Sequence, residues 1–472
     1  MGCVRMPGGG SGLIVNVPGK PGRLRAVLVG ATLLAVSGLA SGGPAAAVVR
    51  GAGHPGPQAA ALAFVLHRGV SFADLPGRGL PARALPRGGQ DVPEPGRASL
   101  LEGVFCLSSS DCWAVGTYSR VAEVDLNEVL HWNGSAWAQV PAPSPAGSAS
   151  GSISLLFGVR CAAVSDCWAV GVSRRNGGAD LNQALHWNGR KWAVVPTPTP
   201  GGSLGSDVNE LFEVGCTSSA SCWAAGRYGT QAGGIVLLNQ LLHWNGKKWS
   251  LTSVPEPAGT AAGDINALDS VRCTSASNCL AVGTYGTTST MLNEALHWDG
   301  TTWSEVSVPS PGGATGGAFN ELVSLACSSA ANCWAVGAYG TFTPPETLLN
   351  QALHWNGSAW SQVTTPEPDG TGGGAIQELV GAACHTATNC WAVGHYGSTG
   401  VILDQALHWD GGTWSQVDTP EPGGAADGDA SDLTGVRCNS ATDCWAVGLA
   451  QMNGGSQFGQ ALHWNGTNWF TG

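Results

Sequence analysis

Charged residues are scarce in this sequence. Asp, Glu, Lys and Arg together make up 11% of the 472 residues, whereas 43% are hydrophobic. A chain with so little charge and so many apolar residues is neither intrinsically disordered nor a coiled coil. Glycine is abundant, with 71 residues, but it lacks the three-residue period of collagen. The composition therefore indicates a globular protein, long enough for one large core or several domains.

Long apolar runs are absent after residue 40, so no later segment of the sequence is able to span a bilayer. Before that point, Lys20, Arg23 and Arg25 precede an apolar run over 26–40, which is followed by the small residues of 41–47. A positive region, an apolar stretch of this length and an A-x-A-like site are the three parts of a secretory signal peptide. A transmembrane anchor is the alternative, but it needs about 20 apolar residues.

The N-terminal pattern leads to a simple domain prediction. We expect a signal peptide over 1–47, a flexible linker or propeptide over 48–85, and one folded domain over 86–472. The mature protein would then be secreted, in the extracellular space or at the cell surface, with no integral membrane span.

Basic residues are rare in the body of the chain. Residues 100–472 contain eleven Lys or Arg and twenty-nine Asp or Glu, a balance of −18. A field of this sign repels phosphate backbones and anionic lipids, so we expect neither a nucleic-acid partner nor peripheral membrane binding. Acidity also keeps secreted proteins soluble, and it does not by itself indicate a ligand.

From residue 100 onward one unit recurs seven times, and its clearest marker is a cysteine pair spaced C-x5-C. An even number of cysteines at fixed spacing in an exported protein indicates disulfides, most simply within each unit. Zinc binding is the alternative, but zinc sites favour closer spacing with a second pair or a histidine nearby. The predicted disulfides use every cysteine except Cys3: Cys106–Cys112, Cys161–Cys167, Cys216–Cys222, Cys273–Cys279, Cys327–Cys333, Cys384–Cys390 and Cys438–Cys444.

All 20 tryptophans lie inside these repeats, in motifs that predict strands. A first strand runs up to the first cysteine, a second contains C-W-A-V-G, a third ends in L-H-W, and a fourth begins with a tryptophan five residues later. The Asn-Gly or Asp-Gly between the third and fourth strands is a strong hairpin signal. No segment shows a sustained helical period.

Four antiparallel strands in about 55 residues, repeated seven times, predict an all-β, seven-bladed β-propeller with one disulfide in each blade. An open solenoid would need polar capping repeats, and the first and last copies resemble the others. The blades begin near residues 100, 155, 210, 267, 321, 378 and 432. Because the last copy lacks the end of its fourth strand, we expect residues 86–95 to join the seventh blade and close the ring; a plain linker is the alternative.

One interval within the repeat varies in length, between C-W-A-V-G and the tryptophan of the third strand. Loops of varied length on a rigid scaffold are where binding usually resides. All five tyrosines fall where the second strand approaches these loops, and Tyr can stack on sugars or hold peptides; packing beneath the loops is the alternative. Arg175 also lies there. The candidate ligand-binding residues are Tyr118, Tyr228, Tyr285, Tyr339, Tyr396, Arg120, Arg174, Arg227 and His395.

Histidine recurs once in every repeat, as in His131 and His186. A residue present in all seven repeats does not define a single active site, so we interpret these histidines as buried side chains that satisfy loop backbone groups. Asp427, Asp429 and Asp432 lack a calcium-loop pattern. We therefore predict no metal, no cofactor and no assigned catalytic residue.

The motifs C-W-A-V-G and L-H-W-N-G-x-x-W resemble the Trp-rich repeats of secreted actinobacterial proteins related to kelch and galactose-oxidase-type propellers. The resemblance covers residues 100–472 and implies a bacterial, exported β-propeller. It implies no activity, because the double glycine of a kelch blade is missing and no cysteine is left for a galactose-oxidase-like copper centre.

Two functions remain open from the sequence. The first is a non-enzymatic extracellular module, monomeric, that recognises a glycan or a protein through the loop-rich face. The second is a carbohydrate-active hydrolase or lyase in which carboxylates at the central mouth act as acid and base. The candidates for that role are Glu123, Asp125, Asp180 and Glu346.

Overall fold

The computed structural model describes residues 98–472, apart from 122–123 and 399. The predicted signal peptide, the linker and the closing segment 86–95 lie outside the described residues. All regular secondary structure in the described part is β-strand, which confirms the prediction of an all-β chain with repeated strand units. In these residues no helix is long and apolar enough to cross a membrane.

The strands follow the motifs of the repeats, which we number 1 to 7 along the chain. The first strand ends just after the first cysteine, the second begins just before the second cysteine, and the fourth is short. Repeats 1 to 4 contain β1 (Ala98–Ser108), β2 (Asp111–Val121), β3 (Val124–Trp132), β4 (Trp137–Gln139), β5 (Ser152–Ala163), β6 (Asp166–Arg174), β7 (Leu181–Trp187), β8 (Trp192–Val194), β9 (Asp207–Ser218), β10 (Ser221–Thr230), β11 (Val236–Trp244), β12 (Trp249–Thr252), β13 (Ile265–Ser275), β14 (Asn278–Thr287), β15 (Thr290–Trp298) and β16 (Trp303–Glu305). Repeats 5 to 7 contain β17 (Ala318–Ser329), β18 (Asn332–Thr341), β19 (Thr347–Trp355), β20 (Trp360–Val363), β21 (Ile376–Thr386), β22 (Asn389–Ser398), β23 (Val401–Trp409), β24 (Trp414–Gln416), β25 (Ala430–Ser440), β26 (Asp443–Gln451), β27 (Gln457–Trp464) and β28 (Trp469–Thr471).

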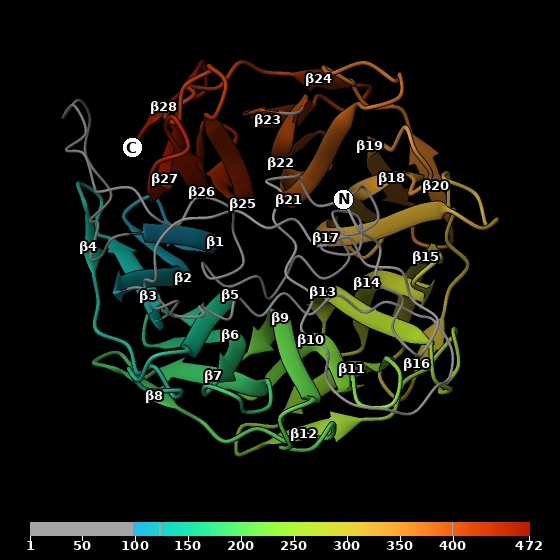
Figure 1. Cartoon of the computed structure of the whole chain (residues 1–472). Helices are drawn as coiled ribbons and strands as arrows, with labels where there is room; N and C mark the ends of the chain where they lie inside the picture. Colours follow the sequence, from blue (N-terminus) through green and yellow to red (C-terminus); the bar gives the residue numbers. More distant parts are fainter. Residues whose placement is uncertain (1–97, 122–123, 399) are drawn as a thin grey trace, which may run out of the picture. The chain divides into compact units, whose positions relative to one another are not determined.

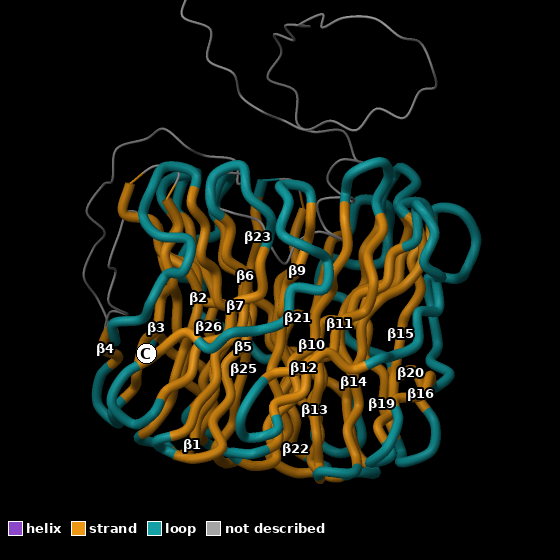
Figure 2. The backbone as a smooth tube through the Cα atoms, turned by 90° about the horizontal axis from the view of Figure 1, so that it is seen from below, coloured by secondary structure: helices purple, strands orange, loops and turns teal. Residues whose placement is uncertain are grey.

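The first strand of each repeat lies nearest the centre of the molecule (Figure 1). These inner strands, β1, β5, β9, β13, β17, β21 and β25, each contact the next, and β25 contacts β1. Seen from the side, the strands run between two rims of loops and turns (Figure 2). All seven predicted disulfides are formed, each joining a first strand to its second strand.

Each inner strand contains a β-bulge three to five residues before its cysteine, as between Leu101 and Gly103 in β1. A bulge changes which side chains face a given side of the strand. The glycine of C-W-A-V-G lies opposite the bulge, and a Cβ on Gly116 would meet the Leu100 carbonyl oxygen at 2.0 Å. The motif therefore needs glycine there so that the two strands can pair closely.

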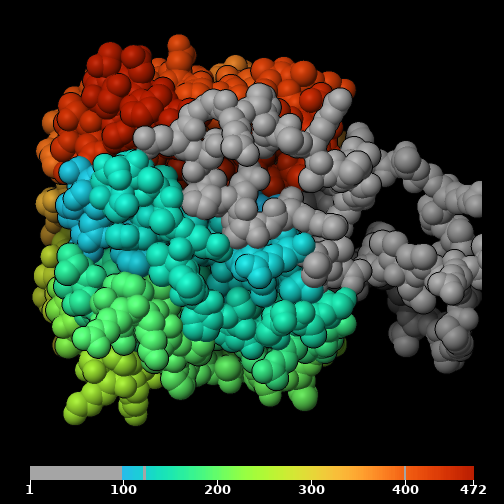
Figure 3. Space-filling model, turned by 90° about the vertical axis from the view of Figure 1, so that its left-hand side faces the viewer, coloured from blue at the N-terminus to red at the C-terminus, as the bar shows by residue number. Residues whose placement is uncertain are grey.

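Hydrogen bonds also link neighbouring repeats, which the repeat pattern does not predict. The third strand of one repeat forms a short parallel bridge to the inner strand of the next, as in Leu237 opposite Ile265. The described strands therefore form two sheets of eight strands and one of twelve. Repeat 7 meets repeat 1 by packing: β1 contacts β25, β26 and β27, and Thr434 Oγ1 donates to the Leu101 carbonyl at 2.6 Å. Figure 3 shows the two repeats, red and blue to teal, side by side.

Tryptophans form most of the packing between repeats. The second-strand tryptophan of one repeat lies against both tryptophans of the next repeat's hairpin. Trp168, for example, lies 4.7 Å from Trp244 and 5.0 Å from Trp249 between ring centroids. The same arrangement joins the two ends of the described fold, where Trp445 packs against Trp132 and Trp137.

A second, polar contact connects several repeats. The Asn127 and Gln183 side chains of repeats 1 and 2 exchange two hydrogen bonds, of 2.8 and 2.9 Å. In repeat 3, Asn239 Nδ2 donates to Glu294 Oε1 of repeat 4 at 2.6 Å. Repeat 6 carries Asp404 where the earlier repeats carry asparagine. The paired amides of Asn127 and Gln183 satisfy each other, whereas Asn239 Oδ1 and Glu294 Oε2 are buried with no hydrogen-bond partner among the described residues.

Asp404 should weaken this contact at neutral pH. Its Oδ1 accepts a 2.9 Å bond from Gln460 Nε2, whereas Oδ2 is buried with no hydrogen-bond partner among the described residues. Burial, assisted by Glu421, raises the pKa of Asp404 well above its usual range. Because the folded-state pKa lies above the unfolded value, the protein loses stability as the pH rises through it.

We expect Asp404→Asn to increase the free energy of unfolding at pH 8 by about 1–3 kcal/mol, the cost of an unsatisfied buried polar group. The gain should disappear near pH 3, where the carboxyl is protonated in both states. Thermal unfolding at the two pH values measures it. The matched variant Asn127→Asp, at the same position of repeat 1, where the amide is paired with Gln183, should show the reverse change, and equal effects at both pH values would contradict the assignment.

Candidate functional site

The two rims of the molecule differ in their connections. The turns between first and second strands, at the disulfide rim, are two residues long in every repeat. At the opposite rim, which we call the loop rim, the connection is two residues between β14 and β15 and six between β6 and β7. The loops that vary in the sequence are therefore together on one side of the fold.

The five predicted tyrosines lie in second strands, one in each of five repeats, and the structure does not bring them together. Tyr118 is buried in β2, and the other four are half-buried. Burial raises the pKa of Tyr339 and of Tyr396, with contributions from Glu367 and Glu421 on the following fourth-strand segments. The alternative that the tyrosines pack beneath the loops fits this placement, and their role in binding remains a prediction.

Four residues predicted to lie in the loops, Arg120, Arg174, Arg227 and His395, lie within strands instead, whereas Arg175 lies in the loop after β6. Arg120 is exposed in β2, with its guanidinium carbon 5.6 Å from the Tyr118 ring centroid. Arg174 ends β6 and pairs with Asp180 at 3.3 Å. Arg227 in β10 is only 5% exposed. These second strands extend further than the motif length suggests, because their pairing with the first strand continues past the glycine.

Arg227 belongs to a buried ion-pair cluster between repeats 2 and 3. Its Nε donates to Glu210 Oε2 at 2.6 Å, and the charges of both Glu210 and Asp180 stabilise the guanidinium. Burial and the neighbouring Glu210 raise the pKa of Asp180 to about 6. The side chains of this cluster are mostly buried. The cluster links the loop that follows β6 to the inner strand of repeat 3.

His395 forms a comparable pair between repeats 6 and 7. Its Nδ1 lies 3.1 Å from Asp432 Oδ1. Asp432 and Glu378 raise the pKa of His395 to about 9 although burial opposes this, so the imidazole is charged at neutral pH. The side chain is buried, and its contact with Asp432 of β25 makes it part of the scaffold rather than of an exposed loop.

The other candidate carboxylates lie apart. Glu123 lies outside the described residues, Asp125 is fully buried in β3, and Glu346 precedes β19 in repeat 5. Asp429 accepts backbone hydrogen bonds from Ala426 and Asn453. Within the described part of the chain, no group of three or more His, Cys, Asp or Glu side chains is arranged to hold a metal ion.

The recurring histidines pair with side chains rather than with loop backbone. His131 Nε2 lies 2.8 Å from Asp111 Oδ1, and the ring lies 4.4 Å from that of Trp113. In repeat 5, His354 contacts Asn332 in the same way at 3.1 Å. All seven are half-buried, and in repeats 1, 2, 3, 5 and 7 the histidine joins the third strand to the residue before the second cysteine.

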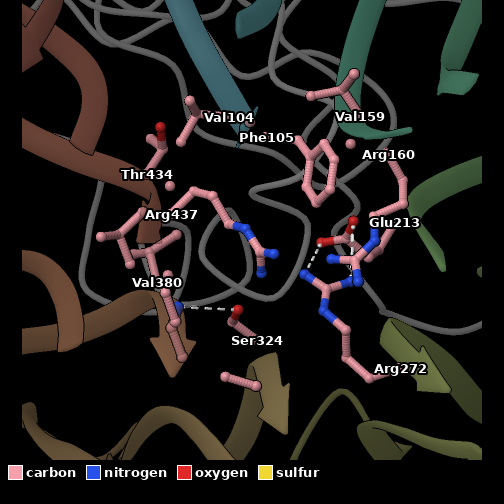
Figure 4. Close-up of a pocket in the computed structure, with 18 of the residues that line it drawn as sticks. Val104, Phe105, Val159, Arg160, Glu213, Arg272, Ser324, Val380, Thr434 and Arg437 are labelled. Carbon is pink, nitrogen blue, oxygen red and sulfur yellow. Dashed lines mark hydrogen bonds and ion pairs between the residues drawn. The ribbon is translucent and has the colours of Figure 1, made fainter. Parts of the chain in front are cut away.

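The structure also contains a cavity on the axis, close to the disulfide rim (Figure 4). It has a volume of about 80 Å³, enough for several water molecules. Its walls come from the inner strands of all seven repeats, at positions just before the first cysteine. Arg160 of β5, Arg272 of β13 and Arg437 of β25 extend into it, and their guanidinium groups face one another.

Phe105 contacts two of these arginines. The guanidinium carbon of Arg160 lies 4.6 Å from the Phe105 ring centroid, and that of Arg437 lies 4.7 Å from it. Such contacts hold a cation over an aromatic face. Arg272 is paired instead with Glu213, through Nη1 to Oε1 and Nη2 to Oε2, both at 3.2 Å.

The cavity is electropositive. Three arginines and two glutamates, Glu102 and Glu213, line it. Burial lowers the pKa of Arg160 well below its usual range, and the charges of Arg437 and Arg272 lower it further. Burial and Arg272 lower the pKa of Arg437 to about 10. The protonated arginines therefore repel one another in a partly desolvated space.

Sequence reasoning misses this cavity, although a signal exists. The residue directly before the first cysteine is Arg in repeats 2, 4 and 7, and Phe, Gly or Ala in the others. A charged residue at a position that is otherwise apolar or small indicates a site that only part of the ring builds. The sequence does not show whether the side chain at this position points toward the axis, because the bulge decides which side chains face it.

No family model matches this sequence, and no curated protein matches it. Among solved structures, an ulvan lyase of a polysaccharide lyase family has a TM-score of 0.50 at 10% identity, covering 81% of this chain and 96% of that chain. The β-propeller domain of the Trilobed protease from Pyrococcus furiosus has a TM-score of 0.44 at 9% identity, covering 79% and 97%. A xyloglucanase from Xanthomonas campestris has a TM-score of 0.44 at 12% identity, covering 81% of this chain and 56% of that chain.

Sequence identities this low support a similar fold and nothing beyond it. The inner strands around one axis, the repeated Trp-containing strand units and the ulvan lyase match agree with one another. The described part of the chain has a β-propeller fold.

Proposed function

We propose that the protein is a secreted, monomeric β-propeller of seven four-stranded blades that acts as a non-enzymatic binding scaffold. Its ligand is an extracellular glycan or protein, held at the loop rim. The seven disulfides support an oxidising compartment, and the packing of Trp445 against repeat 1 supports a closed ring. Its bacterial origin and its place near the kelch propellers belong to the same proposal.

The difference between the rims carries this proposal. Seven equal, disulfide-linked turns form one rim, and loops of unequal length form the other. The loop after β6 is the longest of the described connections between second and third strands and carries exposed Arg175. The loop before β9 carries Leu204, which is 74% exposed. The two loops are close, because a Cβ on Gly205 would meet the Gly177 carbonyl oxygen at 2.7 Å. Exposed Arg175 and Leu204 on these two neighbouring loops are the ligand contacts that we propose.

Glycan-array and extracellular-protein screening of the purified chain tests this function. We expect saturable binding to one ligand class, and a loss of affinity of at least about tenfold in Arg175→Gln/Leu204→Ser, which is about 1.4 kcal/mol. Val164→Ser is the matched control, because Val164 is 67% exposed on a turn of the disulfide rim. Equal losses in both variants would contradict binding at the loop rim.

One observation favours a carbohydrate-active enzyme instead. Asp180, with a pKa of about 6 beside Glu210, has the protonation behaviour of a general acid paired with a second carboxylate. Its side chain is 16% exposed, so substrate access is narrow. Release of reducing or unsaturated ends from polysaccharides by the wild-type chain, abolished in Asp180→Asn, would support the enzyme over the binding scaffold.

A further inference from the structure

We propose that the axial cavity at the disulfide rim is a binding site for a small oxyanion, a carboxylate or sulfate group, held by Arg160 and Arg437. The site lies at the opposite end of the axis from the loop rim. It therefore stands independently of the proposed function, and either one can fail while the other holds.

The arrangement of the arginines is the first argument. Arg160 and Arg437 come from repeats 2 and 7, on the two sides of β1, and both guanidinium groups lie about the Phe105 ring. The N–H donors of a guanidinium lie at its edges. When its flat face packs on an aromatic ring, these donors can still form hydrogen bonds with another group. Two such edges in one cavity form a fork that suits the oxygens of a carboxylate or sulfate.

The second argument is that two of the cavity arginines form no ion pair with the described residues. Glu213 is paired with Arg272 through both carboxylate oxygens, and its charge also stabilises protonated Arg160. Among the described residues, neither Arg160 nor Arg437 forms an ion pair, and Arg437 Nε is buried without a hydrogen-bond partner. A buried cation without an anion is unfavourable. A bound oxyanion would supply the missing acceptors and reduce the repulsion between the arginines.

The size and polarity of the cavity define the ligand class. A space of about 80 Å³ holds one small group, such as sulfate or the carboxylate end of an acidic sugar, and excludes a whole oligosaccharide. Hydroxyl groups are also present, since Ser324 and Thr434 line the cavity. Ser324 Oγ accepts a bond from the Ala382 N–H at 3.1 Å, which leaves its own hydrogen to donate to an anion.

Isothermal titration of the full chain, at constant ionic strength set with chloride, tests the site. The probes are sodium sulfate, sodium glucuronate and uncharged glucose. We expect saturable binding of sulfate, glucuronate or both, and none of glucose. Sulfate alone would identify a free inorganic ion as the ligand, and glucuronate alone a carboxylate. Binding should weaken at least about tenfold in Arg160→Gln and in Arg437→Gln. Arg190→Gln, at an exposed arginine of the turn between β7 and β8, should bind as the wild type does.

A variant with the opposite sign separates recognition from damage to the fold. Glu213→Gln releases Arg272 from its carboxylate and removes a competing negative charge, so we expect it to bind the same probe several-fold more tightly. Absence of saturable binding, unchanged affinity in both Arg160→Gln and Arg437→Gln, an equal loss in Arg190→Gln, or weaker binding in Glu213→Gln would each overturn the proposal.

Discussion

Replacing Trp168 by alanine should lower the free energy of unfolding by about 3–5 kcal/mol, the range measured for large aromatic side chains removed from cores. Trp168 is 0% exposed, and it meets Trp249 edge to face at 83° and lies against Trp244 of the next repeat. The cavity created would separate repeats 2 and 3. Because domains are stable by only about 5–15 kcal/mol, a large decrease in the thermal or denaturant midpoint is expected.

The chain provides its own control for this substitution. Repeat 4 has Leu280 at the equivalent position, where it is 2% exposed and packs with Trp355 and Trp360. Trp168→Leu should therefore retain much of the contact and cost clearly less than Trp168→Ala. Equal losses in the two variants would mean that the aromatic contact, rather than filled volume, stabilises the interface.

The same experiment at Trp445 tests whether the ring is closed. Trp445 packs against Trp132 and Trp137 across the contact between repeats 7 and 1. In a closed ring Trp445→Ala should destabilise the protein about as much as Trp168→Ala, since each removes one contact between repeats. In an open arc the tryptophan would cover an end, and its removal would cost much less.

The strands could be predicted from the sequence because each is marked at a fixed distance from a cysteine or tryptophan. Cys112 pairs with both Cys106 and Trp132 in the registers of β1–β2 and β2–β3, so one motif position aligns three strands. The disulfides follow from the same register. The parallel bridges between repeats were not predictable, because they depend on how closely neighbouring repeats pack and not on any motif.

The candidate site was less predictable for a physical reason. The assignment of residues such as Arg227 to loops assumed that the second strand ends soon after the C-W-A-V-G glycine. The pairing of Arg227 with Glu210 shows that it continues, which turns a presumed surface residue into a buried ion pair. The axial arginines depend on seven strands meeting at one axis, and no single repeat contains that information.

Three glutamates should make the stability of the protein fall between pH 4.5 and 8. Glu256, Glu367 and Glu421 follow the fourth strands of repeats 3, 5 and 6, and each accepts a hydrogen bond from the backbone N–H of the third strand. Burial raises the pKa of each from 4.5 to about 7. A folded-state pKa above the unfolded value means that stability is fully present below pH 4.5 and is lost as the pH rises through 7.

Repeats 1 and 4 show how the same hydrogen bond is made without a charge. There Ser144 and Ser310 accept it, at 3.0 and 3.1 Å. We therefore expect the triple variant Glu256→Ser/Glu367→Ser/Glu421→Ser to lose less stability than the wild type between pH 4.5 and pH 8. These half-buried charges are screened by solvent, so the expected difference is about 1 kcal/mol for each glutamate. Without screening, each unit of pKa shift would contribute ~1.4 kcal/mol, and the difference would be larger.

Denaturant unfolding at pH 4.5, 6, 7 and 8 measures the difference, and the slope with pH matters more than the absolute stability. The three sites lie in different repeats, so their contributions should add to about 3 kcal/mol. Glu305→Ser, at an exposed glutamate of β16, should leave the slope unchanged. A triple variant with the wild-type slope would mean that these carboxyl groups are better solvated than their burial indicates. The serines of repeats 1 and 4 would then be interchangeable with glutamate at every pH.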